Sequence, residues 1–288
     1  MTRMGQFDPE APAVHVWTGD EDIPEFVPLE MPELVLAGPM PPDVIKKRSK
    51  GLRTRKLATP GWKMVTGDVA VVRGNVDTEM LKATSVYTSE LNVMLRSHLG
   101  GSPEQNLFST RLFFDPREYR RQAARAGAAN AESYYDPRSA EIVMHIEHWS
   151  AYIFQRAFAH EFCHAYIDRE HRKTGPLWLM EGLAEWFSNI QWRGDIFVPG
   201  QMNSRALLIL NLNQDLITMK GLLDLPREAM YGMEFAAYYA LAWSLVDYVM
   251  TQMPHGSILE VLHGDPHMLL ANEEAWRGHM RMMISTPS

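Results

Sequence analysis

Segments with the pattern of β-strands are confined to residues 64–148 of this 288-residue chain, and only helical patterns follow them. Met64–Val72 is rich in β-branched residues and carries a turn signal in its middle. Arg111–Phe114 has the composition of a short strand, and Ser133–Asp136 with Glu141–His148 predicts a hairpin. Strands gathered at one end of a chain cannot alternate with helices as a doubly wound sheet requires. The sequence therefore predicts an α+β fold.

Helical patterns join and follow these strands. Asp77 is a suitable cap for a long helix that continues to about His98, with an apolar stripe formed by Leu81, Val86, Leu91, Met94 and Leu95. Further helices are expected at 116–129, 150–171, 176–190 and 234–253. Gly175-Pro176 supplies the reversal between the second and third of these.

The first 58 residues differ in composition from the rest of the chain. Half of the 18 prolines fall within residues 1–60, and acidic residues dominate up to Asp43. A basic run without acidic residues follows, formed by Lys46, Lys47, Arg48, Lys50, Arg53, Arg55 and Lys56. These features are typical of an extended arm and linker. We therefore expect a Pro-rich arm and basic linker at 1–58 and a folded domain at 59–288, with an α+β part at 59–175 and a helical part at 176–288.

Composition and charge exclude several classes of function. Apolar residues make up 46% and charged residues 22%, which is the composition of a globular protein. The net charge of −7 argues against a generic polyanion binder. The basic run could contact nucleic acid or anionic lipid, but such runs are more often solvated, so we do not expect nucleic acid as a partner. The single cysteine, Cys163, excludes a disulfide framework and a Cys-rich zinc module.

No segment has the features of a targeting or membrane-spanning sequence. The N-terminus lacks the apolar core of a signal peptide. The most apolar later stretch, Phe235–Met250, is interrupted by Asp247 and is shorter than the roughly 18 residues that a span needs. We therefore expect no membrane span and a cytoplasmic location. A secreted or periplasmic location would apply if a signal sequence had been removed.

Residues 160–164 read His-Glu-Phe-Cys-His within one of the expected helices. The imidazoles of His160 and His164, four residues apart, leave the same face of a helix one turn from each other. This spacing lets two nitrogens bind one zinc ion at about 2.0–2.1 Å. Glu161 projects about 100° around the helix, beside the metal, where it can take a proton from zinc-bound water.

A second motif can complete this site, because catalytic zinc needs three protein ligands and one open position. Fourteen residues after His164 begins the segment Trp178–Trp186, which contains Glu181 and Glu185 on one face of a helix. One of these glutamates can bind the metal while the other accepts the free N–H of a ligating imidazole. Their neighbours are Trp178, Leu179, Leu183, Trp186 and Phe187, which is too apolar a set for a solvated face.

Other residues near the motif are weaker candidates for a metal ligand. His171 is eleven residues, or about 16 Å, along the helix from His160 and cannot share its ion. Asp168 lies four residues after His164 and could support it, although exposure is the more common state of such a residue. Cys163 could ligate, but a single buried thiol is usually a small apolar residue.

The segments His160-Glu161-x-x-His164 and Trp178-Leu-x-Glu181-Gly-Leu-Ala-Glu185 resemble the gluzincin zinc metallopeptidases. The resemblance covers roughly residues 60–255 and is greatest to the peptidase-MA-like group, with a more distant similarity to aminopeptidase-N-like and thermolysin-like enzymes. It implies a thermolysin-like architecture, with a small mixed sheet, an active-site helix and a mostly helical lower part. It also implies one zinc ion per chain on His160, His164 and Glu181, and Glu161 as general base.

The same resemblance implies roles for residues outside the two motifs. Glu185 would orient a ligand, and Tyr239 would donate a hydrogen bond in the transition state, with Tyr238 and Tyr231 as alternatives. The chain lacks a Gly-x-Met-Glu-Asn-type strand, with which aminopeptidase-N-like enzymes hold a substrate's amino terminus, and this speaks against an exopeptidase.

The expected activity is hydrolysis of peptide bonds in a peptide or protein substrate, by zinc-activated water and a glutamate base. In Glu141–His148, Ile142, Met144 and Ile146 alternate with Val143, His145 and Glu147. This is the pattern of a half-exposed strand, which could form the edge along which a substrate pairs. The alternative function is a catalytically silent binding module that retains the metal site. An intact Glu161 argues against it, because a structural site needs no base.

Overall fold

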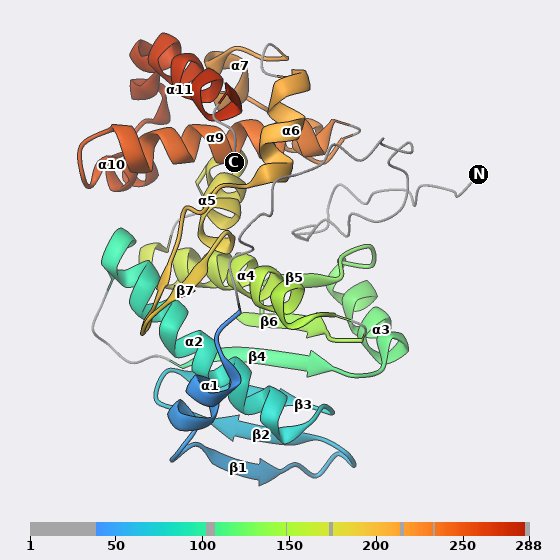
Figure 1. Ribbon diagram of the computed structural model, residues 1–288. Coiled ribbons are helices and arrows are strands. Elements are labelled where there is room, and N and C mark those ends of the chain that lie inside the picture. The colour runs from blue at the N-terminus through green and yellow to red at the C-terminus, as the bar shows by residue number, and fades with distance from the viewer. Residues whose placement is uncertain are drawn as a thin grey trace, which may run out of the picture.

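The computed structural model describes residues 39–101, 107–147, 149–172, 175–213, 216–232 and 234–285. A six-stranded sheet forms one half of the molecule and a group of helices forms the other, joined by α4 and α5 (Figure 1). The strands are β1 (Arg53–Lys56), β2 (Lys63–Thr66), β3 (Ala70–Gly74), β4 (Phe108–Phe113), β5 (Ser133–Asp136) and β6 (Glu141–His145). The α+β prediction is confirmed.

The sheet is mixed and has the order β1-β2-β3-β4-β6-β5. β1, β2 and β3 pair antiparallel, β3, β4 and β6 pair parallel, and β5 returns antiparallel to β6. The parallel pairs require crossovers, which α2 (Thr78–Leu99) supplies between β3 and β4. The apolar stripe expected for this helix is buried: Leu81, Val86, Leu91, Met94 and Leu95.

Helices pack on both faces of the sheet. α2 and α4 (Ala151–His171) pack on one face, and α3 (Pro116–Ala126) packs on the other. A separate apolar cluster under α3 contains Phe113, Tyr119 and Val143. The expectation of a half-exposed strand at Glu141–His148 is therefore wrong, because α3 buries the side of β6 that the alternating pattern assigns to solvent.

The same strand is also not an edge of the sheet. β6 lies between β4 and β5, so that both of its sides are already paired. The edge at this end of the sheet is β5, and no described strand pairs with its outer side. The sequence pattern could not reveal this order, because it depends on which strand pairs with β4.

Part of the expected N-terminal arm belongs to the fold. Residues 42–48 form helix α1, and Arg53–Lys56 form the edge strand β1, which pairs with β2. The basic run is therefore not a linker, although all four residues of β1 are exposed. Met40 is buried, and its backbone N–H donates to Gln155 Oε1 at 3.0 Å. Residues 1–38 of the expected arm lie outside the described residues.

The second half of the chain is mostly helical, as expected, but a short hairpin of β7 (Gln191–Arg193) and β8 (Ile196–Val198) was not predicted. α5 (Leu177–Ser188) packs on α4 and on α9 (Phe235–Gln252). The remaining helices are α6 (Ser204–Asn213), α7 (Met219–Leu223), α8 (Arg227–Met230), α10 (Ser257–His263), the 3-10 turn Pro266–Asn272 and α11 (Glu273–Ser285). None of the helices in the described ranges is long and apolar enough to cross a membrane.

Candidate metal centre

The centre of α4 carries His160, Glu161 and His164 where the helix is buried on every side. Ser150 caps the helix by accepting the Ile153 N–H at 3.2 Å. Sheet residues cover one side of this segment and α5 covers the other. His160 and His164 are only 3% and 6% exposed, and Glu161 is fully buried.

α5 packs on α4 and brings Glu181 against these histidines. On its other side, α5 lies very close to α9. Gly182 makes this approach possible, since a Cβ at this position would lie 2.6 Å from the backbone oxygen of Ala242. A larger residue at 182 would therefore push α5 away from α9 and change the position of the neighbouring Glu181.

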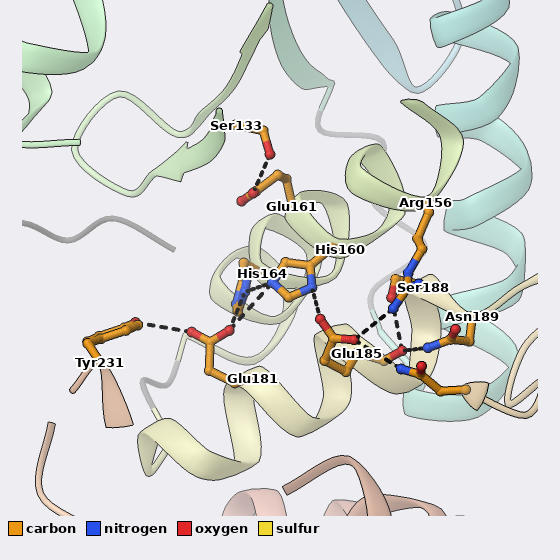
Figure 2. Close-up of polar contacts among 11 residues, drawn as sticks. Ser133, Arg156, His160, Glu161, His164, Glu181, Glu185, Ser188, Asn189 and Tyr231 are labelled. Carbon is orange, nitrogen blue, oxygen red and sulfur yellow. Dashed lines mark hydrogen bonds and ion pairs between the residues drawn. The ribbon is translucent and has the colours of Figure 1, made fainter. Parts of the chain in front are cut away.

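Three side-chain donor atoms converge between α4 and α5 (Figure 2). The Nε2 atoms of His160 and His164 are 3.3 Å apart, and they lie 3.4 and 3.6 Å from Glu181 Oε2. All three residues are buried. Two imidazole nitrogens and one carboxylate oxygen in this arrangement could hold a metal ion.

The hydrogen bonding of Glu181 fits a cation at this point. Tyr231 donates its hydroxyl to Glu181 Oε1 at 3.1 Å, whereas Glu181 Oε2 has no hydrogen-bond partner among the described residues. A fully buried carboxylate oxygen without a donor is costly. A metal ion between this oxygen and the two Nε2 atoms would satisfy it, so the residues fit a bound metal.

The charges of these residues are strongly coupled. Burial lowers the pKa of His160, but its close contacts with the carboxylates of Glu181 and Glu185 outweigh this effect and raise the pKa to about 10. Burial raises the pKa of Glu181, but the two histidines outweigh it and hold the carboxyl well below its usual range. Without a metal, a proton on His160 therefore provides the positive charge that the carboxylates require.

Glu185 contacts Nδ1, the second ring nitrogen of His160. Its Oε1 is 3.3 Å from His160 Nδ1, and its Oε2 is 3.2 Å from Arg156 Nη2 and 3.5 Å from Asn203 Nδ2. Burial raises the pKa of Glu185, but the hydrogen bond from His160 and the charge of Arg156 lower it overall. Of the two glutamates on α5, Glu181 therefore faces the shared point between the histidines and Glu185 faces away from it.

Glu161 leaves α4 on a neighbouring face and reaches Ser133 of the sheet (Figure 2). Its Oε1 accepts from Ser133 Oγ at 2.9 Å, and its Oε2 has no hydrogen-bond partner among the described residues. Burial raises the pKa of this carboxyl, although the two histidines act against the increase. Ser133 is the first residue of the edge strand β5, so Glu161 lies between the metal group and that edge.

The three tyrosines considered as hydrogen-bond donors in the transition state have different surroundings. Tyr231 is bound to Glu181, as described above. Tyr239 on α9 is buried, its hydroxyl has no hydrogen-bond partner among the described residues, and burial together with the charge of Glu181 raises its pKa. Tyr238 donates to Glu234 at 2.8 Å and belongs to a different environment.

The three weaker candidates for a metal ligand, Asp168, His171 and Cys163, do not belong to this metal group. Asp168 accepts the hydroxyl of Tyr135 from β5 at 2.5 Å, and His171 Nδ1 lies 3.1 Å from His263 Nε2. Cys163 is buried, and burial raises the pKa of its thiol well above the usual value. Asp168 is thus a second anchor of β5 on α4 instead of a support for His164.

Sequence reasoning missed four residues that hold the site: Ser133, Arg156, Asn203 and Tyr231 in its contact with Glu181. All except Arg156 come from elements distant in sequence. Arg156 precedes His160 by one helical turn, and this i,i+4 spacing was the one signal that could have indicated it.

No protein-family model, curated protein or solved structure matches this chain. The assignment of function therefore depends on the site itself.

Proposed function

We propose that this protein is a zinc-dependent metallopeptidase of the gluzincin type, with a thermolysin-like division into a sheet half and a helical half. One observation carries the proposal: His160, His164 and Glu181 converge on one point, and Glu161, on the same helix, has an unpartnered carboxylate oxygen among the described residues and lies near enough to both histidines for their charges to lower its pKa. A purely structural metal group has no need of this additional buried carboxylate.

The donor set favours zinc. Two neutral imidazoles and one carboxylate are the ligands of catalytic zinc sites that keep one position open. Zinc held there would polarise the scissile carbonyl and lower the pKa of a bound water.

Glu161 is the general base in this proposal. Its Oε2 is free to accept the proton of the attacking water and to pass it to the leaving amine. Ser133 holds the other oxygen, which fixes the rotation of the carboxylate. Burial raises the pKa of Glu161, and a raised pKa makes the carboxyl a better proton acceptor and donor near neutral pH.

Tyr239 is the best candidate for stabilising the oxyanion. Its hydroxyl is unpartnered among the described residues, whereas that of Tyr231 already binds Glu181. A hydroxyl held only loosely beside Glu181 can turn toward a developing negative charge.

The substrate would pair with β5. This strand is the edge of the sheet, and Ser133 and Tyr135 tie it to α4 at Glu161 and Asp168. An extended peptide added to β5 would therefore lie alongside the helix that carries the proposed base. This replaces the pairing with Glu141–His148 that the sequence suggested.

A metal-containing binding module without catalysis is the second candidate. Near-complete burial of His160, Glu161 and Glu181 favours it, because a substrate must reach these groups. The test is a digest of a peptide library by the protein loaded with one zinc per chain, read by mass spectrometry. The peptidase proposal predicts cleavage that Glu161→Gln abolishes, and a zinc-loaded wild type that cleaves no peptide would favour the binding module.

A further inference from the structure

Arg156 lies on α4, one turn before His160, and its guanidinium points to α5 (Figure 2). Its Nη2 atom is 3.2 Å from Glu185 Oε2, while Glu185 Oε1 is 3.3 Å from His160 Nδ1. The two residues of α4 thus contact the same carboxylate from α5, one at each oxygen. Arg156 and His160 hold the two oxygens of one carboxylate between them.

Further contacts hold Glu185 on its backbone side. Ser188 Oγ and Asn189 Nδ2 donate to the Glu185 carbonyl oxygen at 2.9 and 2.6 Å. Asn203 Nδ2 is 3.5 Å from Glu185 Oε2, and Asn203 Oδ1 accepts the Ala206 N–H at 3.0 Å at the start of α6. The backbone of Glu185 is therefore fixed, and its remaining freedom is rotation of the side chain.

We propose that Arg156 is a positioning residue of the metal centre, which locks the carboxylate of Glu185 so that it accepts the Nδ1–H of His160. With Nδ1–H held by Glu185, His160 Nε2 faces the point that it shares with His164 Nε2 and Glu181 Oε2, where it could bind a metal. The inference rests on the proposed metal site but not on catalysis at that site.

An alternative role for Arg156 is a simple ion pair that joins α4 to α5. The two roles differ in how the effect depends on Glu185. An ion pair that only joins the helices would lower the free energy of unfolding and leave zinc affinity unchanged, whereas a positioning residue changes zinc affinity, and does so only while Glu185 is present to be oriented.

The experiment measures the affinity of the purified full chain for Zn²⁺ in competition with a chromophoric chelator. The variants are Arg156→Ala, Arg156→Lys, Glu185→Gln and the double variant Arg156→Ala/Glu185→Gln. Arg277→Ala is the matched control, because Arg277 forms a similar part-buried pair with Glu273 at 3.1 Å, on α11. Arg156→Gln replaces Arg156→Ala if the latter does not fold.

We expect Arg156→Ala to weaken zinc binding roughly 10–100-fold, the usual effect of losing such a supporting contact. Arg156→Lys should recover most of the loss, Arg277→Ala should leave the affinity unchanged, and the double variant should resemble Glu185→Gln alone. Unchanged affinity in Arg156→Ala, or additive losses in the double variant, would overturn the inference. Zinc binding by the wild type without hydrolysis of any peptide would contradict the peptidase and leave this inference standing.

A second readout needs no metal. In metal-free wild type, the Nδ1–H of His160 should give a resolved, slowly exchanging proton signal in NMR spectra. Arg156→Ala should lose this signal while Arg277→Ala keeps it. A signal that persists unchanged in Arg156→Ala would contradict the positioning role.

Discussion

Two buried carboxylates in the helical half of the molecule face histidines, and they differ in how their oxygens are used. Asp247 on α9 has one donor for each oxygen: Trp186 Nε1 lies 2.9 Å from Oδ1, and His279 Nε2 lies 2.8 Å from Oδ2. Glu181 has a donor on Oε1 only, while two imidazole nitrogens stand 3.4 and 3.6 Å from Oε2.

The difference separates a structural group from a candidate metal site. In the group of Asp247 each carboxylate oxygen has its own donor, and these hydrogen bonds tie α5, α9 and α11 together. The group of Glu181 leaves one acceptor and two nitrogens directed at a common point. Both groups pair a buried carboxylate with imidazole, but only the group of Glu181 has the arrangement that could hold a cation.

The largest expected effect is the loss of zinc when a histidine of the Glu181 group is replaced, whereas replacing the histidine of the Asp247 group should cause no such loss. His160→Ala or His164→Ala should abolish stoichiometric zinc, because only two ligands would remain. His279→Ala should retain one zinc per chain. The check is metal analysis by mass spectrometry after dialysis against a weak chelator, and full zinc in either of the first two variants would refute the ligand assignment.

The next effect concerns activity without metal loss. Glu161→Gln keeps the size of the side chain but removes the proton acceptor, so hydrolysis should fall by roughly 10²–10⁴. Zinc content should stay near that of the wild type, because Glu161 is not in the metal group. Steady-state kinetics on a cleaved peptide measure this effect, and an active Glu161→Gln enzyme with zinc would exclude the proposed base.

The pH dependence of zinc binding should follow from His160. Its pKa is raised from 6.5 to about 10 by Glu181 and Glu185, and zinc must displace this proton. Zinc affinity should therefore rise about tenfold per pH unit below the raised pKa. Competition titrations at pH 6.5, 7.5 and 8.5 measure the slope, and an affinity independent of pH would show that His160 is already neutral.

The raised pKa of His160 also predicts how the stability of the metal-free protein depends on pH. A raised pKa in the folded state means that protonated His160 stabilises the fold fully below pH 6.5, and that this contribution is lost as the pH rises through about 10. The free energy of unfolding in urea should thus decline over this range. His160→Gln should remove most of the decline, and His279→Gln should not.

The smallest effect is expected for the group of Asp247, Trp186 and His279, in which each oxygen of the carboxylate has a donor. Asp247→Ala leaves the indole N–H of Trp186 and the Nε2 of His279 without their acceptor, which should cost about 1–3 kcal/mol of stability for each unsatisfied group. Zinc content should not change. Urea unfolding followed by circular dichroism measures the loss, and loss of zinc in this variant would show that the two groups are coupled.

The parts of the site that depend on local spacing were predictable from the sequence. His160 and His164 share a helical face, and the apolar surroundings of Glu181 and Glu185 indicated a buried second helix. Which glutamate faces both histidines depends on how α5 lies on α4, and spacing left that open. Ser133, Tyr231 and Asn203 approach from other elements, so their contacts follow only from the tertiary structure.

The fold could be predicted to the level of its class and most of its elements. The order of strands could not, because β1 pairs with β2 and β6 lies inside the sheet for reasons of long-range packing. The basic run at 46–56 was therefore assigned to a linker, although hydrogen bonding to β2 makes part of it a strand. The exposed side of β6 was misjudged because α3, folded from residues 116–126, covers it.

X-ray absorption at the zinc edge tests the central claim most directly, because it reports the atoms that surround the ion in the wild-type protein. The site described here predicts two imidazoles and carboxylate oxygen, with the remaining position filled by a light atom and no sulfur. A sulfur neighbour would place the metal on Cys163, and a spectrum without imidazole scattering would place it away from His160 and His164. Either spectrum would contradict the account.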